Sequence, residues 1–288
     1  MRILVVQESD WLEKGPHQGH HLMERLSQRG HEIRVIDFEI LWRKKAMKRL
    51  MSKRRIFSGI HKATYNGNVM VIRPTILRLP IFEYLSLILF HWKEIHRQMK
   101  EFRPDLIIGF GILNALIAIR IAKQAKVPFV YYIIDELHLL IPQKYLRGIA
   151  KLIERINMKN ATIVLAINDA LREYTIRMGA RKERTEVIRA GVNLNKFKMN
   201  ETIRKEIRTK YRFADEDIIL FFMGWLYDFS GLREVAAELA KPEWQESRIK
   251  LLIIGTGDLL QELREIEKAM RTGKIIIENW KPYDEIPG

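Results

Sequence analysis

The chain has 288 residues, of which 47% are hydrophobic and 30% are charged, and its net charge is +15 at pH 7. This length suits two α/β domains of ordinary size. The absence of cysteine excludes a disulfide framework and any zinc site built on thiolates. It fits a reducing cytosol and, together with the many Lys, Arg and Glu residues, a thermophilic source.

The amino-terminal segment runs directly into a strand pattern without an apolar leader, so no signal peptide is expected. The longest uncharged run covers residues 106–119 and is shorter than the about 20 apolar residues that span a bilayer. We therefore expect a cytoplasmic protein, either dissolved or peripheral on the inner face of the cell membrane. The positive charge favours an anionic partner such as a membrane surface or a nucleic acid.

Apolar strand patterns alternate with helical patterns through the first two thirds of the chain. Strands are expected at 2–7, 32–38, 69–73, 105–110, 128–134, 162–167 and 185–190, and helices at about 22–30, 81–101, after 112, 145–158 and 170–178. This alternation predicts a parallel sheet with right-handed crossovers. Because the strands are apolar throughout, both faces of the sheet should be covered.

A second, shorter set of strands follows a polar, charge-rich segment. Strands are expected at 218–223, 250–255 and 274–280, with helices after Gly231 and at 259–270. We predict two Rossmann-like doubly wound α/β domains: residues 1–195, a linker at 196–217 and a partial second domain at 218–288. A doubly wound domain has about five or six strands. We therefore expect a chain truncated inside this domain rather than a natural half-domain, which would leave a sheet edge uncovered.

The loop after the first strand is the first candidate site, since ligands of open α/β sheets bind at the carboxyl ends of strands. Gly15 and Gly19 allow close backbone approach, and the following helix offers free N–H groups to a phosphate. The loop lacks the GxGxxG pattern of nicotinamide binding. His17, His20 and His21 also lie here, and we favour loop or helix-cap roles for them over a metal site.

Polar residues follow three other strands. Asp135 and His138 come after strand 128–134, where they could serve catalysis or bind sugar hydroxyls. In the alternative, Asp135 caps the next segment and His138 is solvated. Asp169 follows strand 162–167, where capping is the favoured role. In the second domain, loops with free N–H groups are expected after the first two strands, and their candidate donor-binding residues are Gly224, Gly255, Gly257 and Asp258.

Several stretches resemble the retaining glycosyltransferases of family 4, which have the two-domain GT-B fold. They are QRGHEIRVI (28–36), RPDLIIGFG (103–111), VIRAGVNLNKF (187–197), LLIIGTGDLLQEL (251–263) and IIIENWKPYDEIP (275–287). The resemblance spans the whole chain in order. It implies transfer of a sugar from a nucleotide-diphosphate donor, bound in a cleft between the domains. No metal cofactor is expected, because main-chain dipoles and cations can take its role.

The chain departs from the family pattern where the donor diphosphate is held. The family motif GRLxxxKG carries two cations, and this chain has Trp225 and Ser230 at those positions. Arg233 is a candidate substitute. The acidic pair of the E-x7-E motif is expected beyond Gly288. Because stabilising the departing diphosphate is central to such catalysis, the alternative function is a non-catalytic GT-B protein that binds membrane or nucleic acid through its basic face.

The segment 41–57 is strongly basic with interleaved apolar residues. On a helix it would form a cationic face suited to an anionic membrane. The membrane-binding candidates are Trp42, Arg43, Lys44, Lys45, Lys48, Arg49, Lys53, Arg54 and Arg55. The helix at 81–101, with its apolar residues Phe82, Tyr84, Leu85, Ile88, Leu89 and Trp92, could add contact, although core packing is favoured. No nucleic-acid-binding motif accompanies the segment, so membrane ranks above nucleic acid.

The function predicted is a retaining hexosyltransferase that moves a sugar to a lipid-linked or envelope glycan acceptor at the membrane face. Asp135 and His138 would hold the acceptor or the sugar, and the Gly15–Gly19 loop would face the diphosphate.

Overall fold

A computed structural model describes residues 1–44, 49–80, 82–141, 143–191, 194, 197–270, 272–281 and 285–286, with the side chains of residues 43 and 44 outside the description. The chain divides into two compact units, Met1–Gly191 and Val192–Gly288. Within the described residues, no helix has both the length and the apolar character needed to cross a bilayer.

The first unit contains an eight-stranded sheet in the order β3-β4-β2-β1-β5-β6-β7-β8. Its strands are β1 (Arg2–Val6), β2 (Glu32–Ile36), β3 (Arg55–Ile60), β4 (Val69–Arg73), β5 (Leu106–Gly109), β6 (Phe129–Ile133), β7 (Ile163–Ala166) and β8 (Thr185–Val187). All neighbouring pairs are parallel except β3 with β4, which is antiparallel and shifts register between Phe57 and Ile60. This antiparallel edge strand was not predicted from the sequence, in which the residues of β3 stand beside a run of cations.

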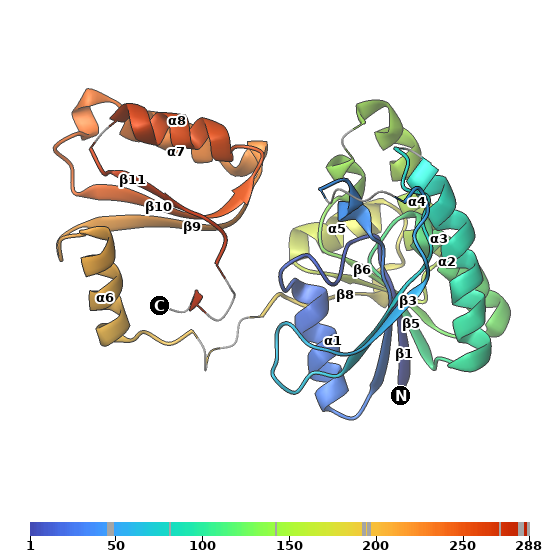
Figure 1. Cartoon of the computed structure of the whole chain (residues 1–288). Coiled ribbons are helices and arrows are strands. Elements are labelled where there is room, and N and C mark those ends of the chain that lie inside the picture. Colours follow the sequence, from blue (N-terminus) through green and yellow to red (C-terminus); the bar gives the residue numbers. More distant parts are fainter. Residues whose placement is uncertain are drawn as a thin grey trace. The chain divides into compact units, whose positions relative to one another are not determined.

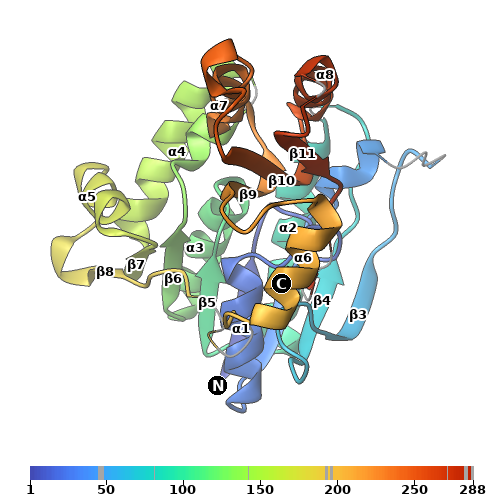
Figure 2. The same cartoon turned by 90° about the vertical axis from the view of Figure 1, so that its left-hand side faces the viewer.

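Helices cover both faces of the large sheet (Figure 1). They are α1 (Gln18–Gln28), α2 (Phe82–Glu101), α3 (Leu113–Ala125), α4 (Arg147–Asn160) and α5 (Asp169–Arg177). Helices α2, α3 and α4 lie side by side in one layer, and α1 lies on the opposite face (Figure 1). In Figure 2 the strands of this sheet are spread across the view, from β8 on the left to β3 on the right.

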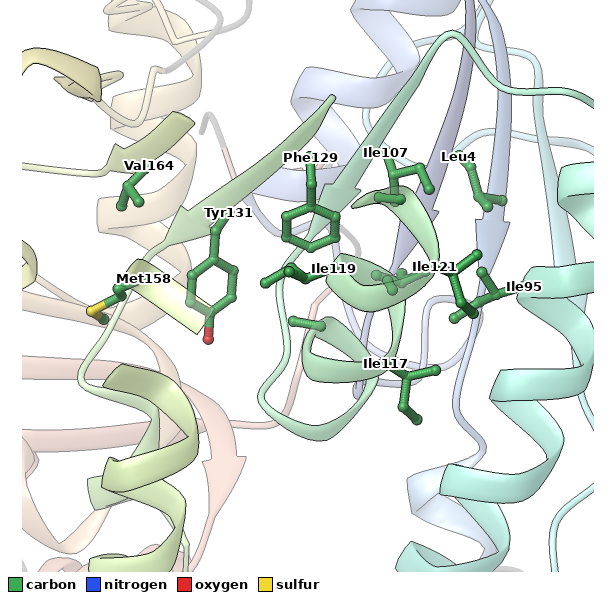
Figure 3. Close-up of a cluster of buried hydrophobic side chains, with 14 of the residues drawn as sticks. Leu4, Ile95, Ile107, Ile117, Ile119, Ile121, Phe129, Tyr131, Met158 and Val164 are labelled. Carbon is green, nitrogen blue, oxygen red and sulfur yellow. The ribbon is translucent and has the colours of Figure 1, made fainter. Parts of the chain in front are cut away.

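Each face of the sheet has its own apolar core. On the α3 side, Ile117, Ile119 and Ile121 pack with Phe129 and Tyr131 of β6 (Figure 3). On the α1 side, Met23 and Trp11 pack on Val5 and Val35. The expectation of a parallel sheet buried on both faces is confirmed.

The second unit holds a three-stranded parallel sheet in the order β11-β10-β9. Its elements are α6 (Glu201–Tyr211), β9 (Ile218–Leu226), α7 (Leu232–Leu239), β10 (Ile249–Gly257), α8 (Leu260–Met270) and β11 (Ile275–Glu278). In its core, Leu232, Ala236 and Leu239 of α7 pack with Leu263 of α8 and Ile253 of β10. The smaller second sheet agrees with the expected incomplete second Rossmann-like domain.

The segment between the predicted domains is not irregular throughout. Residues 196–217, expected as a linker, contain α6 (Glu201–Tyr211), whose first turn is capped by the side chain of Asn200. The division into compact units falls between Gly191 and Val192. The predicted limits of 195 and 218 for the two domains stay a prediction.

Candidate functional site

The loop after β1 leads into α1 through a pair of histidines. The backbone N–H of His17 donates to Nδ1 of His20 at 3.0 Å, and Nε2 of His20 lies 2.9 Å from the carbonyl of Trp11. Burial lowers the pKa of His20 to about 3 and that of His17 to about 4, so both rings are neutral at physiological pH. The two histidines therefore fix the start of α1, in agreement with the favoured cap role.

The two glycines of this loop differ in their surroundings. A Cβ at Gly15 would meet nothing within 4 Å, whereas one at Gly19 would contact the rings of Trp11 and Phe110 at 3.5 and 3.8 Å. Neither position is sterically closed to alanine, because both distances are ordinary van der Waals contacts. A role in facing a diphosphate stays a prediction for both.

Glu8 was not singled out in the sequence, and it occupies the start of α3. Its Oε1 accepts the backbone N–H of Asn114 at 2.8 Å. Burial raises the pKa of Glu8, while hydrogen bonds from the backbone at 112–114 act in the opposite direction. The start of α3 is thus already bound to a carboxylate. This carboxylate belongs to a residue that follows β1, 106 positions before Asn114 in the sequence.

The predicted pair after β6 separates into an exposed and a buried member. Asp135 is exposed, and the surrounding protein raises the pKa of its carboxyl group by desolvation. His138 is 4% exposed, and its Nδ1 lies 2.8 Å from Oε2 of Glu154 in α4. The hydroxyl of Tyr174 in α5 lies 3.3 Å from the same nitrogen. His138 therefore ties the loop after β6 to two helices, and Asp135 is the member open to a ligand.

A buried ionic cluster lies at the carboxyl ends of β1, β2 and β4. Arg73 contacts Asp10 and Asp37, each at 2.5 Å, and Arg78 contacts Glu39 at 2.9 Å. Burial raises the pKa of Asp37 to about 6, since desolvation outweighs the attraction of Arg73. Sequence patterns do not reveal this cluster, because its members are distant in the chain: Arg73 follows Asp10 by 63 positions.

The described part of the basic segment is not one helix. It contains a 3-10 helix, Ile40–Lys44, and the start of the strand β3, Arg55–Ile60. Trp42 is half-buried and packs against the cluster of Phe38, Ile76 and Leu87. The predicted membrane residues Lys45 and Lys48 lie outside the described residues, as do the side chains of Arg43 and Lys44.

The remaining predicted membrane residues fall into two groups. Arg49 and Lys53 are exposed. Arg54 forms a two-point ion pair with the buried Glu94, at 2.7 and 2.8 Å, and Arg55 contacts Glu39 at 2.7 Å. Two of the basic residues therefore stabilise buried carboxylates of the first unit.

Gly224, Gly255 and Gly257 lie within paired strands rather than in loops after them. Gly224 pairs with Gly255, and Leu226 pairs with Gly257. A Cβ at Gly255 would lie 2.0 Å from the carbonyl oxygen of Gly224, and one at Gly257 would lie 2.4 Å from the nitrogen of Leu226. The expected strand ends at Met223 and Gly255 are wrong by a few residues, and close strand approach alone requires glycine at two of these positions.

Arg233 is held by two carboxylates. Its guanidinium lies 2.6 Å from Glu262 and 2.7 Å from Asp228. The hydrogen bonds to Glu262 and Asp228 raise the pKa of Arg233, and the bond to Glu262 has the larger effect. A diphosphate would compete with both carboxylates for this cation. Asp258, the last predicted donor-side residue, is exposed in the turn before α8.

Aromatic side chains line the end of β9, where the family motif carries its first cation. Trp225, Tyr227 and Phe229 are exposed, and the rings of Tyr227 and Phe229 stack with centroids 4.8 Å apart. Within the described residues, no group of three or more His, Cys, Asp or Glu side chains is placed to hold a metal ion.

The family model of Glycosyltransferase Family 4 matches residues 19–196, more than half of the chain. The chain belongs to glycosyltransferase family 4. No curated protein matches the sequence. The family assignment confirms the resemblance stated from the motifs, including those at 28–36 and 103–111.

Solved structures of GT-B glycosyltransferases share the fold of this family member. Anabaena HepE, in complex with UDP-glucose, is 18% identical, with 100% of this chain and 70% of that chain covered at a TM-score of 0.66. Sucrose-phosphate synthase from Thermosynechococcus elongatus is 15% identical, with 99% and 72% covered at a TM-score of 0.71. WaaG, a glycosyltransferase involved in lipopolysaccharide biosynthesis, is 12% identical, with 96% and 70% covered at a TM-score of 0.64. At these identities the likeness is one of fold.

Proposed function

We propose that this glycosyltransferase moves a hexose, with retention of anomeric configuration, from a nucleotide-diphosphate sugar to a lipid-linked or envelope glycan acceptor at the membrane face. The family match over residues 19–196 carries the proposal. The UDP-glucose bound to HepE supports a nucleotide-sugar donor. A cytoplasmic location, peripheral on the inner face of the cell membrane, accompanies it.

Asp135 is the residue that we assign to the acceptor or the sugar. It follows β6 directly and is exposed, and its raised pKa favours a carboxyl group that can exchange a proton nearer neutrality. His138 is buried against Glu154, so it would act on the substrate through the position of the loop. The residues that we assign to the donor are Gly15 and Gly19 of the first unit, which would face the diphosphate, and Gly224, Gly255, Gly257, Arg233 and Asp258 of the second unit.

No metal is required in this proposal. Main-chain N–H groups and cations can stabilise the departing diphosphate. Anionic lipid is the proposed surface partner, with Arg49 and Lys53 as the exposed cations of the basic segment. Nucleic acid is the less favoured partner.

Calorimetry of the full-length protein with UDP-glucose and with GDP-mannose tests the donor. We expect saturable binding of one of them, and Asp135→Asn should retain that binding while losing sugar transfer to a lipid-linked acceptor. Glu173→Gln is the matched control, since this carboxylate of α5 is 59% exposed and both fold and transfer should be unchanged. Absence of saturable binding with both donors contradicts the transferase proposal.

A non-catalytic role is the second candidate, and a specific observation favours it. Trp225 and Ser230 stand at the positions of the family's two cations, and Arg233 is already paired with two carboxylates. In that case the chain would bind membrane or nucleic acid without binding donor. The same calorimetry separates the two, because saturable donor binding rules out the non-catalytic role.

A further inference from the structure

Helix α2 has its polar side buried and its apolar side exposed. Its buried residues are Glu83, Ser86, Leu87, His91, Glu94, Ile95 and Gln98. Most of these are polar, and several have partners: Glu94 binds Arg54, and the hydroxyl of Ser86 accepts the backbone N–H of Leu77 at 2.9 Å. A helix on the surface of a soluble domain normally has the opposite arrangement.

The outward side of α2 carries a cluster of large apolar residues. Phe82, Leu85, Ile88, Leu89 and Trp92 are 41–58% exposed. Core packing was the favoured expectation for these residues, and it is wrong for all five. The exposed basic residues Lys93 and Lys100 follow them toward the end of the helix.

Helix α4 repeats this pattern. Ile149, Leu152 and Ile156 are 40–61% exposed and lie on one side of the helix, because three and four residues separate them. Lys151, Arg155 and Lys159 form a parallel exposed row at intervals of four. The apolar row is therefore flanked by cations whose long side chains can reach past it.

Helix α3 joins the two rows into one face. It contacts both α2 and α4, and the three helices form one layer (Figure 1). Leu113 and Leu116 near its start are partly exposed, and Arg120 and Lys123 follow them. Each helix follows a parallel strand, so its start lies at the carboxyl edge of the sheet. The apolar part of this helix face thus lies toward the edge that carries Asp135.

The charges of the helix face point to an anionic partner. All residues of α2, α3 and α4 are described, and among their acidic residues Glu83, Glu94 and Glu154 are buried. Within these three helices, only Glu101, at the last position of α2, is acidic and exposed. The surface therefore has apolar residues at its centre, basic residues around them and no exposed carboxylate over most of the length of the three helices. This arrangement matches an anionic bilayer.

We propose that the helix face, formed by the exposed residues of α2, α3 and α4, lies in the headgroup region of an anionic membrane. Phe82, Leu85, Trp92, Ile149 and Leu152 enter the acyl boundary, and the lysines and arginines contact lipid phosphates. The docked face holds the carboxyl edge of the large sheet close to the bilayer. The proposal rests on the membrane action in the proposed function, and it adds the helix face to the exposed cations of the basic segment, Arg49 and Lys53.

Co-sedimentation with vesicles tests this face without donor or acceptor, so a failure of transferase activity does not affect it. The vesicles are phosphatidylcholine alone and phosphatidylcholine mixed with phosphatidylglycerol. We expect the chain to bind the anionic vesicles preferentially. The variant Leu85→Ser, Trp92→Ser, Ile149→Ser, Leu152→Ser should bind them at least about tenfold more weakly.

The matched control is Met199→Ser with Ile218→Ser, which removes two exposed apolar side chains from the second unit and should leave binding unchanged. A second variant, Lys151→Gln with Arg155→Gln and Lys159→Gln, keeps the apolar residues and should lose the preference for anionic vesicles. Far-ultraviolet circular dichroism confirms that each variant is folded.

Two results would overturn the proposal. One is equal anionic-vesicle binding by the chain and both helix-face variants. The other is self-association of the chain, measured by light scattering, that the four serine substitutions abolish, because a second copy would then cover the face.

Discussion

Each of the two units contains an arginine bound by carboxylates, and the two arginines differ in their surroundings. Arg73 in the first unit is 3% exposed and contacts Asp10, Asp37 and, at 3.5 Å, Glu39. Arg233 in the second unit is 38% exposed and contacts Asp228 and Glu262. Since burial removes the screening by water, the first cluster should control stability and the second should be open to competition by a ligand. The two arginine–carboxylate clusters therefore have different expected roles, one in stability and one in ligand binding.

The largest expected effect is that of Arg73→Met. The substitution leaves two buried carboxylates without their cation, and we expect a loss of about 3–5 kcal/mol in the free energy of unfolding. Urea denaturation measures it. The control is Arg189→Met, because the side chains of Arg189 and its partner Asp169 are 67% and 71% exposed and their ion pair should contribute at most about 1 kcal/mol. Equal losses in the two variants would remove the distinction drawn from burial.

The loss of stability caused by Arg73→Met should depend on pH. The folded-state pKa of Asp37 is about 6, above its ordinary value of 3.8. Ionisation of this carboxyl group therefore lowers the stability of the fold as pH rises from 3.8 to about 6. Without Arg73 its pKa should rise further. The loss caused by Arg73→Met should therefore be smaller at about pH 5 than at about pH 7.5, as urea denaturation at the two values would measure.

An intermediate effect is expected at Glu154. Glu154→Leu removes the carboxylate that lies 2.8 Å from Nδ1 of His138 and leaves only the more distant hydroxyl of Tyr174 there, and we expect a loss of about 1.5–3 kcal/mol. Glu154→Gln retains an acceptor and should lose less. Glu173→Leu, at an exposed position of α5, is the control and should change stability by less than about 0.5 kcal/mol. Thermal and urea unfolding that fail to separate Glu154→Leu from Glu173→Leu would contradict the anchoring role of His138.

The smallest effect on stability is expected in the second unit. Asp228→Asn with Glu262→Gln frees Arg233, which should then bind UDP about tenfold more tightly, as one added phosphate hydrogen bond would. Adding Arg233→Ala to that variant should abolish the gain. Calorimetry measures both. Unchanged UDP affinity in the double variant would show that Arg233 does not reach the diphosphate.

The fold follows largely from local sequence patterns. Strands such as β1 and β6 are almost continuous apolar runs, and a parallel sheet is the arrangement that buries both of their sides. The strand β3 was missed because its residues alternate poorly and stand beside a run of cations. Its place depends on pairing with β4, a tertiary contact that local pattern does not record.

Less of the candidate site than of the fold could be predicted from the sequence. Asp135 and His138 were found by their position after a strand, but the sequence cannot show that one is exposed and the other bound to Glu154. The periodicity of the large apolar residues in α2 marks a helix with one apolar side, and it does not show which side meets the sheet. In α2 the buried side carries polar residues, including Glu94, which is paired with Arg54.

The edges of the large sheet have a consequence for aggregation. On one side β3 ends the sheet with a register shift between Phe57 and Ile60, and on the other side β8 has only three residues. An irregular strand and a very short strand are poor templates for pairing with another molecule. Crowding of many copies during overexpression should therefore not extend this sheet from one molecule to the next.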